Sequence, residues 1–339
     1  MTEQVANLDE IRALLAQLPG PDLAAGTAAR VRQAQLTKPM GSLGRLEELA
    51  VWLATWQARH PPRLDHPRTL VFAANHGVAA RGVSAYPAAV TAQMVQNFIA
   101  GGAAVNQLCR VFDAGLKVYE MNLDKPTGDI VVEPAMSEEE CAKAMAYGMM
   151  AVEPGIDVLA LGEMGIGNTT AAAALCAGLF GGAAELWTGP GTGVAGAALE
   201  AKHAAVAEAV MRHRHAAGDP FDMLRRLGGF ELAAIAGAVM AARLGRVPVV
   251  LDGFASTAAA AVLFAADPRG LDHCVVAHLS AEPGHRRLVE QIGQRPLFDL
   301  GMRLGEASGA TLAFGVLQAA VACHNGMATF AEAGVSGPS

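Results

Sequence analysis

A single carboxylate stands between small residues near the end of the chain, in the run Arg303-Leu304-Gly305-Glu306-Ala307-Ser308-Gly309. From Ala307 to Phe330 the sequence has no Asp, Glu, Lys or Arg. A carboxylate at the start of such an uncharged segment is expected to be shielded from water, which raises its pKa and suits it to accept a proton near neutral pH. Glu306 is therefore a candidate general base. The alternative, an acid that favours a helix N-terminus, is the better interpretation on this pattern alone.

A glycine-rich run in the middle of the chain is typical of a loop that binds phosphate. The run Gly162-Glu163-Met164-Gly165-Ile166-Gly167-Asn168-Thr169-Thr170 follows a predicted strand and precedes an alanine-rich helix. Glycines let backbone N–H groups face an anion, and the helix N-terminus adds a partial positive charge. The spacing is that of neither a P-loop nor a dinucleotide fingerprint. We expect this run to hold a phosphate or a ribose; the alternative is a tight turn capped by Asn168 or Thr169.

Two further runs carry groups that suit a phosphorylated sugar. Gly189-Pro190-Gly191-Thr192-Gly193 precedes a predicted helix with Lys202, one of only five lysines in the chain. The Lys202 charge could neutralise a phosphate, although a solvated helix lysine is equally compatible with the pattern. Asp252 and Gly253 end the predicted strand 247–252. Asp252 is placed either to bond a ribose hydroxyl or to cap the next helix, and the sequence favours neither.

Composition excludes several classes of protein. Of the 339 residues, 52% are hydrophobic and 17% charged, and the net charge is -7 without any basic run, so the electrostatic footprint of nucleic-acid binding is missing. The five cysteines show no C-x-x-C spacing, which indicates free thiols in the cytoplasm. Met1–Gln4 lacks the features of a secretory signal. The two long uncharged segments contain polar residues and glycines, which favours buried helices over membrane spans.

Apolar runs alternate with helical stretches along the middle of the chain. This alternation predicts an α/β fold with a doubly wound, mainly parallel sheet that is covered by helices on both faces. Ligands of such sheets bind beyond the carboxyl ends of the strands, where most of the runs above fall. The expected strands are 69–74, 116–121, 129–132, 158–162, 247–252 and 274–279, and the expected helices include 8–32, 88–111, 137–151, 200–215 and 231–244.

The loop after the first expected strand mixes polar and aromatic side chains. Ser84 and Tyr86 lie there, and Gln93 follows one helical turn inward, as expected of a pocket for a flat ring. His278 and His285 flank Glu282 in a run that has metal-ligating residue types. No further ligand stands at suitable spacing, so no metal site is predicted.

These runs, in this order, resemble the nicotinate-nucleotide:5,6-dimethylbenzimidazole phosphoribosyltransferase family. The resemblance implies transfer of the phosphoribosyl group of nicotinate mononucleotide to 5,6-dimethylbenzimidazole, with Glu306 as general base and without a cofactor or metal. It also implies a homodimer with a large α/β domain over 36–324 and a small helical domain built from 1–35 and 325–339. Pro190 departs from the family, in which a basic residue often stands at this position. The matching stretches are 38–48, 75–106, 162–170, 189–193, 248–260, 278–285, 304–312 and 327–335.

The remaining site residues are assigned within this resemblance. Phosphate and ribose are expected to contact Glu163, Gly165, Gly167, Asn168, Thr169, Gly191, Gly193, Lys202, Asp252 and Gly253. The base pocket is expected to contain Ser84, Tyr86, Gln93 and Leu304. Two other interpretations stay open: a non-catalytic nucleotide-binding regulator on the same fold, and a different glycosyl-transfer enzyme such as a nucleoside phosphorylase. The sequence does not decide which base is preferred.

Overall fold

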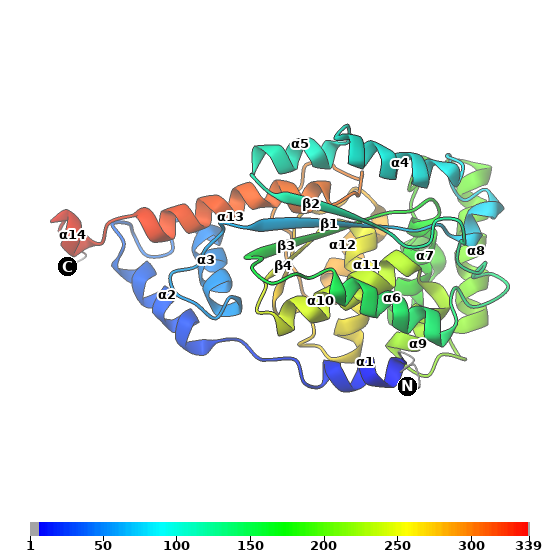
Figure 1. Ribbon diagram of the computed structural model, residues 1–339, viewed down its shortest axis with the longest axis horizontal. Coiled ribbons are helices and arrows are strands. Elements are labelled where there is room, and N and C mark those ends of the chain that lie inside the picture. Colours follow the sequence, from blue (N-terminus) through cyan, green and yellow to red (C-terminus); the bar gives the residue numbers. More distant parts are fainter. Residues whose placement is uncertain (1–6, 338–339) are drawn as a thin grey trace.

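The computed structural model describes residues 7–337, so Met1–Gln4 lie outside the described residues. Its centre is a five-stranded sheet in the order β2-β1-β3-β4-β5, with every neighbouring pair parallel (Figure 1). The chain leaves β1 toward one edge and then crosses to β3 on the other side, so the sheet is doubly wound and the predicted α/β class is confirmed. The strands are β1 (Pro67–Ala73), β2 (Gly115–Glu120), β3 (Val158–Met164), β4 (Val249–Leu251) and β5 (Cys274–Val276).

Both faces of the sheet are buried, because alternate side chains of each strand enter different hydrophobic clusters. In β1, Leu70 and Phe72 belong to the larger cluster and Val71 to the smaller one. The larger cluster contains α6 (Glu138–Met150), α7 (Asn168–Phe180), α10 (Phe230–Leu244) and α11 (Phe254–Ala266). The smaller cluster contains α3 (Arg45–Trp56), α4 (Ala89–Ala100), α5 (Ala104–Val111) and α13 (Ser308–Gly326).

Glycines allow the backbones of α6 and α10 to come into direct contact. A Cβ added at Gly148 in α6 would lie 1.9 Å from the carbonyl oxygen of Ala234 in α10. A Cβ at Gly237 in α10 would lie 2.0 Å from the carbonyl oxygen of Met145. The pair of helices therefore forms a rigid layer under β1 and β3, and this layer fixes the start of α10 beneath the site described below.

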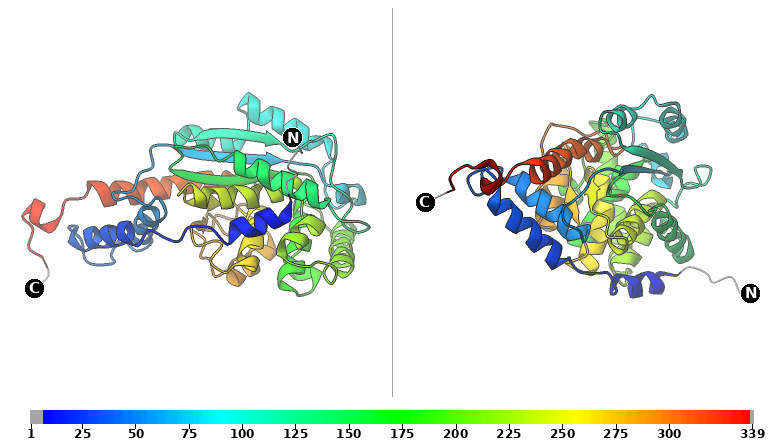
Figure 2. Two further views of the ribbon diagram at one scale, coloured as in Figure 1. Left: turned by 60° about the horizontal axis from the view of Figure 1, so that its bottom comes forward. Right: turned by 60° about the vertical axis from the view of Figure 1, so that its left-hand side comes forward.

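A helical lobe extends from one end of the sheet. It contains α2 (Leu23–Gln35), α3, the last turns of α13, and α14 (Phe330–Ala333), which lie together in both figures (Figure 2). Arg32 joins α2 to the end of α13 by donating to the carbonyl oxygens of His324, Asn325 and Met327. By contrast, α1 (Leu8–Leu15) packs on α6 at the side of the sheet. The division into domains at residues 35 and 325 stays a prediction.

Three expected elements differ in the structure. The expected helix 8–32 is divided into α1 and α2, with Pro19, Gly20 and Pro21 between them. Residues 129–132 form turns rather than a strand, because Asp129 accepts hydrogen bonds from the N–H groups of Val131, Val132 and Glu133. The expected helix 88–111 is divided into α4 and α5 at Gly101, whose φ is 80°. The other helices are η1 (Gly77–Arg81), η2 (Ala184–Leu186), α8 (Ala197–His213), α9 (Pro220–Leu227) and α12 (Pro283–Gln291). None of the helices described is both long and apolar enough to cross a bilayer.

Candidate active site

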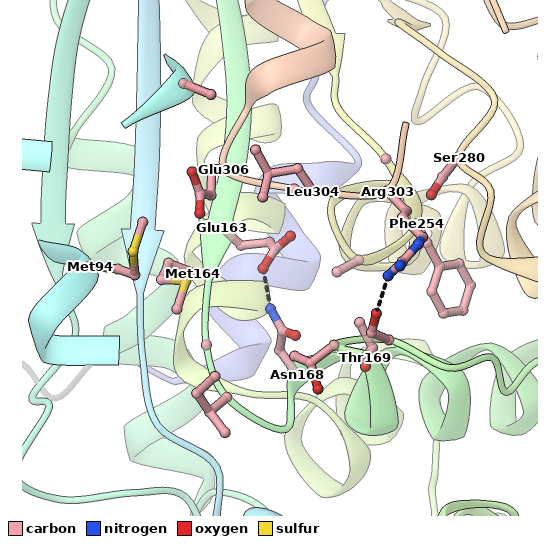
Figure 3. Close-up of a pocket in the computed structure, with 18 of the residues that line it drawn as sticks. Met94, Glu163, Met164, Asn168, Thr169, Phe254, Ser280, Arg303, Leu304 and Glu306 are labelled. Carbon is pink, nitrogen blue, oxygen red and sulfur yellow. Dashed lines mark hydrogen bonds between the residues drawn. The ribbon is translucent and has the colours of Figure 1, made fainter. Parts of the chain in front are cut away.

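A cavity of about 660 Å³ opens at the carboxyl edge of the sheet. Residues that follow β3, β4 and β5 form its walls together with the segment that leads into α13 (Figure 3). Glu163, Leu304 and Glu306 face one part of the cavity, whereas Phe254, Ser280 and Arg303 face another. The cavity therefore lies where a doubly wound parallel sheet is expected to bind its ligand.

Glu306 is held at the cavity by a close contact between two segments. Glu306 and Ala307 both adopt left-handed backbone conformations, with φ of 61° and 58°. A Cβ added at Gly162 in β3 would lie 2.0 Å from the backbone nitrogen of Ala307, so only glycine fits there. The N–H of Glu306 donates to the carbonyl oxygen of Glu163 at 3.2 Å. Strained backbone of this kind concentrates at functional sites, where the surrounding structure enforces it.

Burial changes the acidity of the two carboxyl groups in this wall. Glu306 is 6% exposed, and its burial raises its pKa to about 7. Burial also raises the pKa of Glu163 to about 8, with further contributions from the negative charges of Glu231, Asp252 and Glu306. Asn168 opposes this shift because its amide Nδ2 donates to the Glu163 carboxylate. Near neutral pH these carboxyl groups can therefore gain and lose protons, as general-base catalysis requires.

The other part of the cavity has donors suited to an anion. Arg303 Nη1 donates to the carbonyl oxygen of Gly191 at 3.0 Å, and Glu282 Oε1 accepts from the Gly191 N–H at 2.9 Å. Lys202 lies fully buried behind this loop, where Nζ donates to Thr169 Oγ1 and to the carbonyl oxygen of Gly189, each at 2.9 Å. Burial lowers the pKa of Lys202 to about 8. Arg303 lines the cavity at this end together with the Glu282 carboxylate, whereas Lys202 lies behind the wall.

The first turn of α7 also faces the cavity. Gly167 is the N-cap of this helix with a φ of 97°, and Gly165, Asn168 and Thr169 follow the cavity wall. No side chain caps the helix, so the alternative of a turn capped by Asn168 or Thr169 is not what the structure shows. The N–H groups of Asn168 and Thr170 already donate to the carbonyl oxygens of Gly165 and Gly167, so an anion at this helix N-terminus would use the remaining donors of the first turn.

The structure brings most of the predicted residues to one place. Gly167, Lys202 and Asp252 lie behind the cavity wall. Asp252 Oδ1 accepts from the N–H of Ala310 at 2.8 Å, so it caps α13 rather than the helix that follows it in sequence. The predicted residues that line the cavity are Tyr86, Glu163, Gly165, Asn168, Thr169, Gly191, Gly253, Leu304 and Glu306.

Three predicted residues lie away from the cavity. Ser84 contacts Thr192, with 3.0 Å between the two hydroxyl oxygens. Gly193 lies in the same loop as Thr192, where a Cβ would meet no atom within 4 Å. Gln93 is exposed on α4 and does not line the cavity, whereas its neighbour Met94 does. Their roles stay predictions.

Sequence reasoning missed several residues of the cavity. His278, Ser280 and Glu282 follow β5 and belong to a stretch that matches the family, but no site role was predicted for them, although their position after a buried strand indicates this edge of the sheet. Arg303 stands three residues before Glu306, yet its bond to the distant Gly191 had no sequence signal. The other missed side chains are Val90, Met94, Asn97, Met164, Ile166, Thr192 and Phe254.

Of the two histidines after β5, His285 is held by protein groups, whereas neither ring nitrogen of His278 has a hydrogen-bond partner among the described residues. His285 Nδ1 accepts from the N–H of Ser280 at 2.8 Å, and its Nε2 lies 3.1 Å from Thr257 Oγ1. Among residues 7–337, no three His, Cys, Asp or Glu side chains are grouped as a metal site would need.

Known proteins are similar to this chain over nearly its full length. The family model described as phosphoribosyltransferase matches residues 18–335. The chain is 60% identical over 328 residues to nicotinate-nucleotide–dimethylbenzimidazole phosphoribosyltransferase of Sinorhizobium medicae, covering 97% of each chain. It is 56% identical over 329 residues to the protein of the same name from Brucella anthropi, again with 97% of each chain covered.

A solved structure extends the similarity to three dimensions. It is the nicotinate-nucleotide–dimethylbenzimidazole phosphoribosyltransferase of Thermus thermophilus, with a TM-score of 0.86 and 42% identity over 93% of this chain and 99% of that chain. Sequence and fold therefore agree over nearly the full length. The chain belongs to the nicotinate-nucleotide–dimethylbenzimidazole phosphoribosyltransferase family.

Proposed function

We propose that this protein transfers the phosphoribosyl group of nicotinate mononucleotide to a ring nitrogen of 5,6-dimethylbenzimidazole. The products are nicotinate and α-ribazole 5'-phosphate. A bond forms between the azole nitrogen and C1' of the ribose, and the bond from C1' to the pyridinium nitrogen breaks. The pyridinium leaves as a neutral ring, so the leaving group needs no general acid. The proton to be removed is the one on the second azole nitrogen.

Glu306 is the general base in this proposal. Its carboxyl group lies at the cavity wall, and burial raises its pKa to about 7, so a large fraction is ionised and able to accept a proton at neutral pH. This position and acidity are the observation that carries the proposal. Tyr86, Met94 and Leu304 line the cavity with apolar surface of the kind that receives a flat ring. We place Ser84 and Gln93 at the edge of this base pocket.

The phosphate occupies the opposite end of the cavity. Arg303, the loop around Gly191 and the N-terminus of α7 surround that end, and Lys202 supports them from behind. Gly165, Gly167, Asn168 and Thr169 present backbone and side-chain donors to the phosphate or the ribose. Gly193, Asp252 and Gly253 complete the predicted contacts. Glu163 bonds the ribose or stabilises the positive charge that develops on it during transfer.

We extend the proposal to the state of the protein in the cell. It acts in the cytoplasm as a homodimer on small molecules and does not bind nucleic acid, since its net charge is -7 without any basic run. Apolar side chains that a partner would bury include Leu23, Met40, Ile99 and Leu304, which are 70%, 85%, 68% and 56% exposed. Light scattering on the purified protein measures the oligomeric state directly.

The reaction is tested by incubating the purified protein with nicotinate mononucleotide and 5,6-dimethylbenzimidazole in the presence of a metal chelator. Chromatography follows nicotinate and α-ribazole phosphate together. We expect both to appear in equal amounts. Intact nicotinate mononucleotide after prolonged incubation would reject the transferase and favour a nucleotide-binding protein. Phosphate-dependent cleavage of nucleosides would favour a phosphorylase instead.

A further inference from the structure

A buried histidine–glutamate pair lies behind the cavity wall and has no part in the roles assigned above. His76 follows β1, and Glu231 stands in the first turn of α10. His76 Nε2 lies 2.7 Å from Glu231 Oε1, and both side chains are 0% exposed. Removing such groups from water is costly, and a buried pair is weak evidence of a role in stability. The surroundings of the pair indicate a functional role instead.

The His76 ring packs directly against the loop that forms the cavity wall. His76 Cδ2 lies 3.5 Å from the position that a Cβ would take at Gly165, and His76 Cβ lies 3.2 Å from that position at Gly167. At Gly229, the N-cap of α10, an added Cβ would come within 2.3 Å of His76 Cε1. The imidazole therefore fills the space between the loop and the start of α10, and the loop depends on it for support.

Glu231 acts on the cavity through its charge. It is the largest cause after burial of the raised pKa of Glu163, ahead of Asp252 and Glu306. These three acids come from three different segments, namely α10, the loop after β4 and the loop before α13. Asn168 from α7 opposes them by donating a hydrogen bond to Glu163. Among the groups facing Glu163, Glu231 is thus the strongest influence that lies outside the cavity wall.

We propose that His76 and Glu231 form a positioning pair for the transfer reaction, in which Glu231 orients the His76 ring and His76 holds the loop from Gly165 to Asn168 in place for the phosphoribosyl substrate. The inference rests on the proposed function, because it concerns the same site. Donation from the His76 Nε2–H to Glu231 would fix the ring tautomer and orientation. His76 Nδ1 and Glu231 Oε2 find no hydrogen-bond partner among the described residues, so the single bond between the two side chains carries their mutual orientation.

The hydrogen bond between Glu231 and His76 is tested by Glu231→Gln and Glu231→Asp. Glu231→Gln keeps an oxygen that can accept from His76, so KM for nicotinate mononucleotide should stay close to the parent value. Glu231→Asp has a shorter reach, so the His76 ring loses its partner and KM should rise several-fold.

Glu200→Asp is the matched control. Glu200 also stands in the first turn of a helix, α8, but its side chain is 79% exposed. The substitution shortens a carboxylate side chain by the same amount far from the pair, so KM should equal that of the parent. An equal rise of KM in this variant would overturn the proposal.

His76→Gln tests the support of the loop. We expect KM for nicotinate mononucleotide to rise several-fold more than kcat falls, with the thermal midpoint recorded to measure the folded fraction. A parent-like KM in this variant, or in Glu231→Asp, overturns the proposal. So does a loss of activity in proportion to the loss of folded protein. Absence of product from the unmodified protein rejects the proposed function instead, so the two failures are distinguishable.

Discussion

At the scale of single residues, the position of Glu306 explains its acidity. Among residues 7–337 the carboxyl group has no cation partner, and burial alone raises its pKa to about 7. The backbone turns left-handed at Glu306 and Ala307 to place the side chain at the cavity. The uncharged segment after Glu306 is what made a raised pKa predictable from sequence. The left-handed turn was not predictable, because it depends on the distant Gly162.

Replacing Glu306 by Gln should abolish most of the activity. The amide has nearly the same shape but does not accept the azole proton at neutral pH, so we expect kcat to fall by about 10²–10⁴-fold, the usual worth of general-base catalysis. Turnover is measured with saturating nicotinate mononucleotide and 5,6-dimethylbenzimidazole, and circular dichroism checks the fold. Unchanged kcat would remove Glu306 from the mechanism.

The activity should also depend on pH in a defined direction. Since the pKa of Glu306 is raised to about 7, the ionised base becomes scarce below that value, and kcat/KM should fall about tenfold per pH unit on the acidic side. Above pH 7 the rate should level off. Initial rates between pH 5 and 9 give the profile, and the residual activity of Glu306→Gln gives its control. If the fall in kcat/KM on the acidic side persists unchanged in this variant, the group that titrates belongs to the substrate or to another residue.

At the scale of elements, the site results from the arrangement of strand ends. The loops after β3, β4 and β5 were recognised as polar or glycine-rich runs, and their shared position follows from parallel strands. These sequence runs do not predict the order of the strands in the sheet, because that order depends on which helices pack on which face. The turn at Asp129 shows the same limit, since local hydrogen bonds from three N–H groups outweigh an apolar run that is typical of a strand.

The contact between β3 and the segment before α13 should tolerate no side chain at Gly162. In Gly162→Ala the new methyl group would lie 2.0 Å from the backbone nitrogen of Ala307, and backbone has to move to relieve the overlap. We expect a loss of about 1–3 kcal/mol in the free energy of unfolding, as for other overpacked sites. We also expect a clear loss of kcat, because a shift of the Ala307 backbone also displaces Glu306. Urea denaturation and turnover measure the two effects.

Gly20→Ala is the control for that experiment. A Cβ at Gly20 would meet no atom within 4 Å, and its φ lies outside the left-handed region. Stability and activity should both stay close to those of the parent. Equal losses in the two variants would show that the close contact at Gly162 is not the cause.

At the scale of the whole molecule, two helical segments far apart in sequence meet in one lobe. Arg32 links α2 to the end of α13, and Leu36 and Thr329 form an isolated antiparallel bridge. The family resemblance implied that the two ends of the chain form one helical domain, but not that α1 would lie apart from it on α6. The packing of α1 on α6 illustrates this, because an amphipathic helix shows which face is buried without showing what covers it.

The raised pKa of Glu306 also affects the stability of the whole protein. Because the pKa of Glu306 is raised to about 7 in the folded state, this carboxyl group stays protonated there while it ionises in the unfolded chain from about pH 4.5 upward. The contribution of this carboxyl group to the free energy of unfolding is therefore fully present at low pH and is lost progressively as the pH rises from 4.5 to about 7. Gln does not ionise, so Glu306→Gln should be more stable than the parent at pH 8, by on the order of 2–3 kcal/mol at most.

The comparison that decides this is the difference in unfolding free energy between parent and Glu306→Gln, measured at pH 4 and at pH 8. At pH 4 both side chains are neutral in both states, so the difference should be close to zero. It should grow between pH 4.5 and 7 and then level off. A variant that is less stable at pH 8 would mean that the ionised carboxylate is stabilised in the free protein. The opposite result, a less active but more stable variant, would show that the general base is retained at a cost in stability.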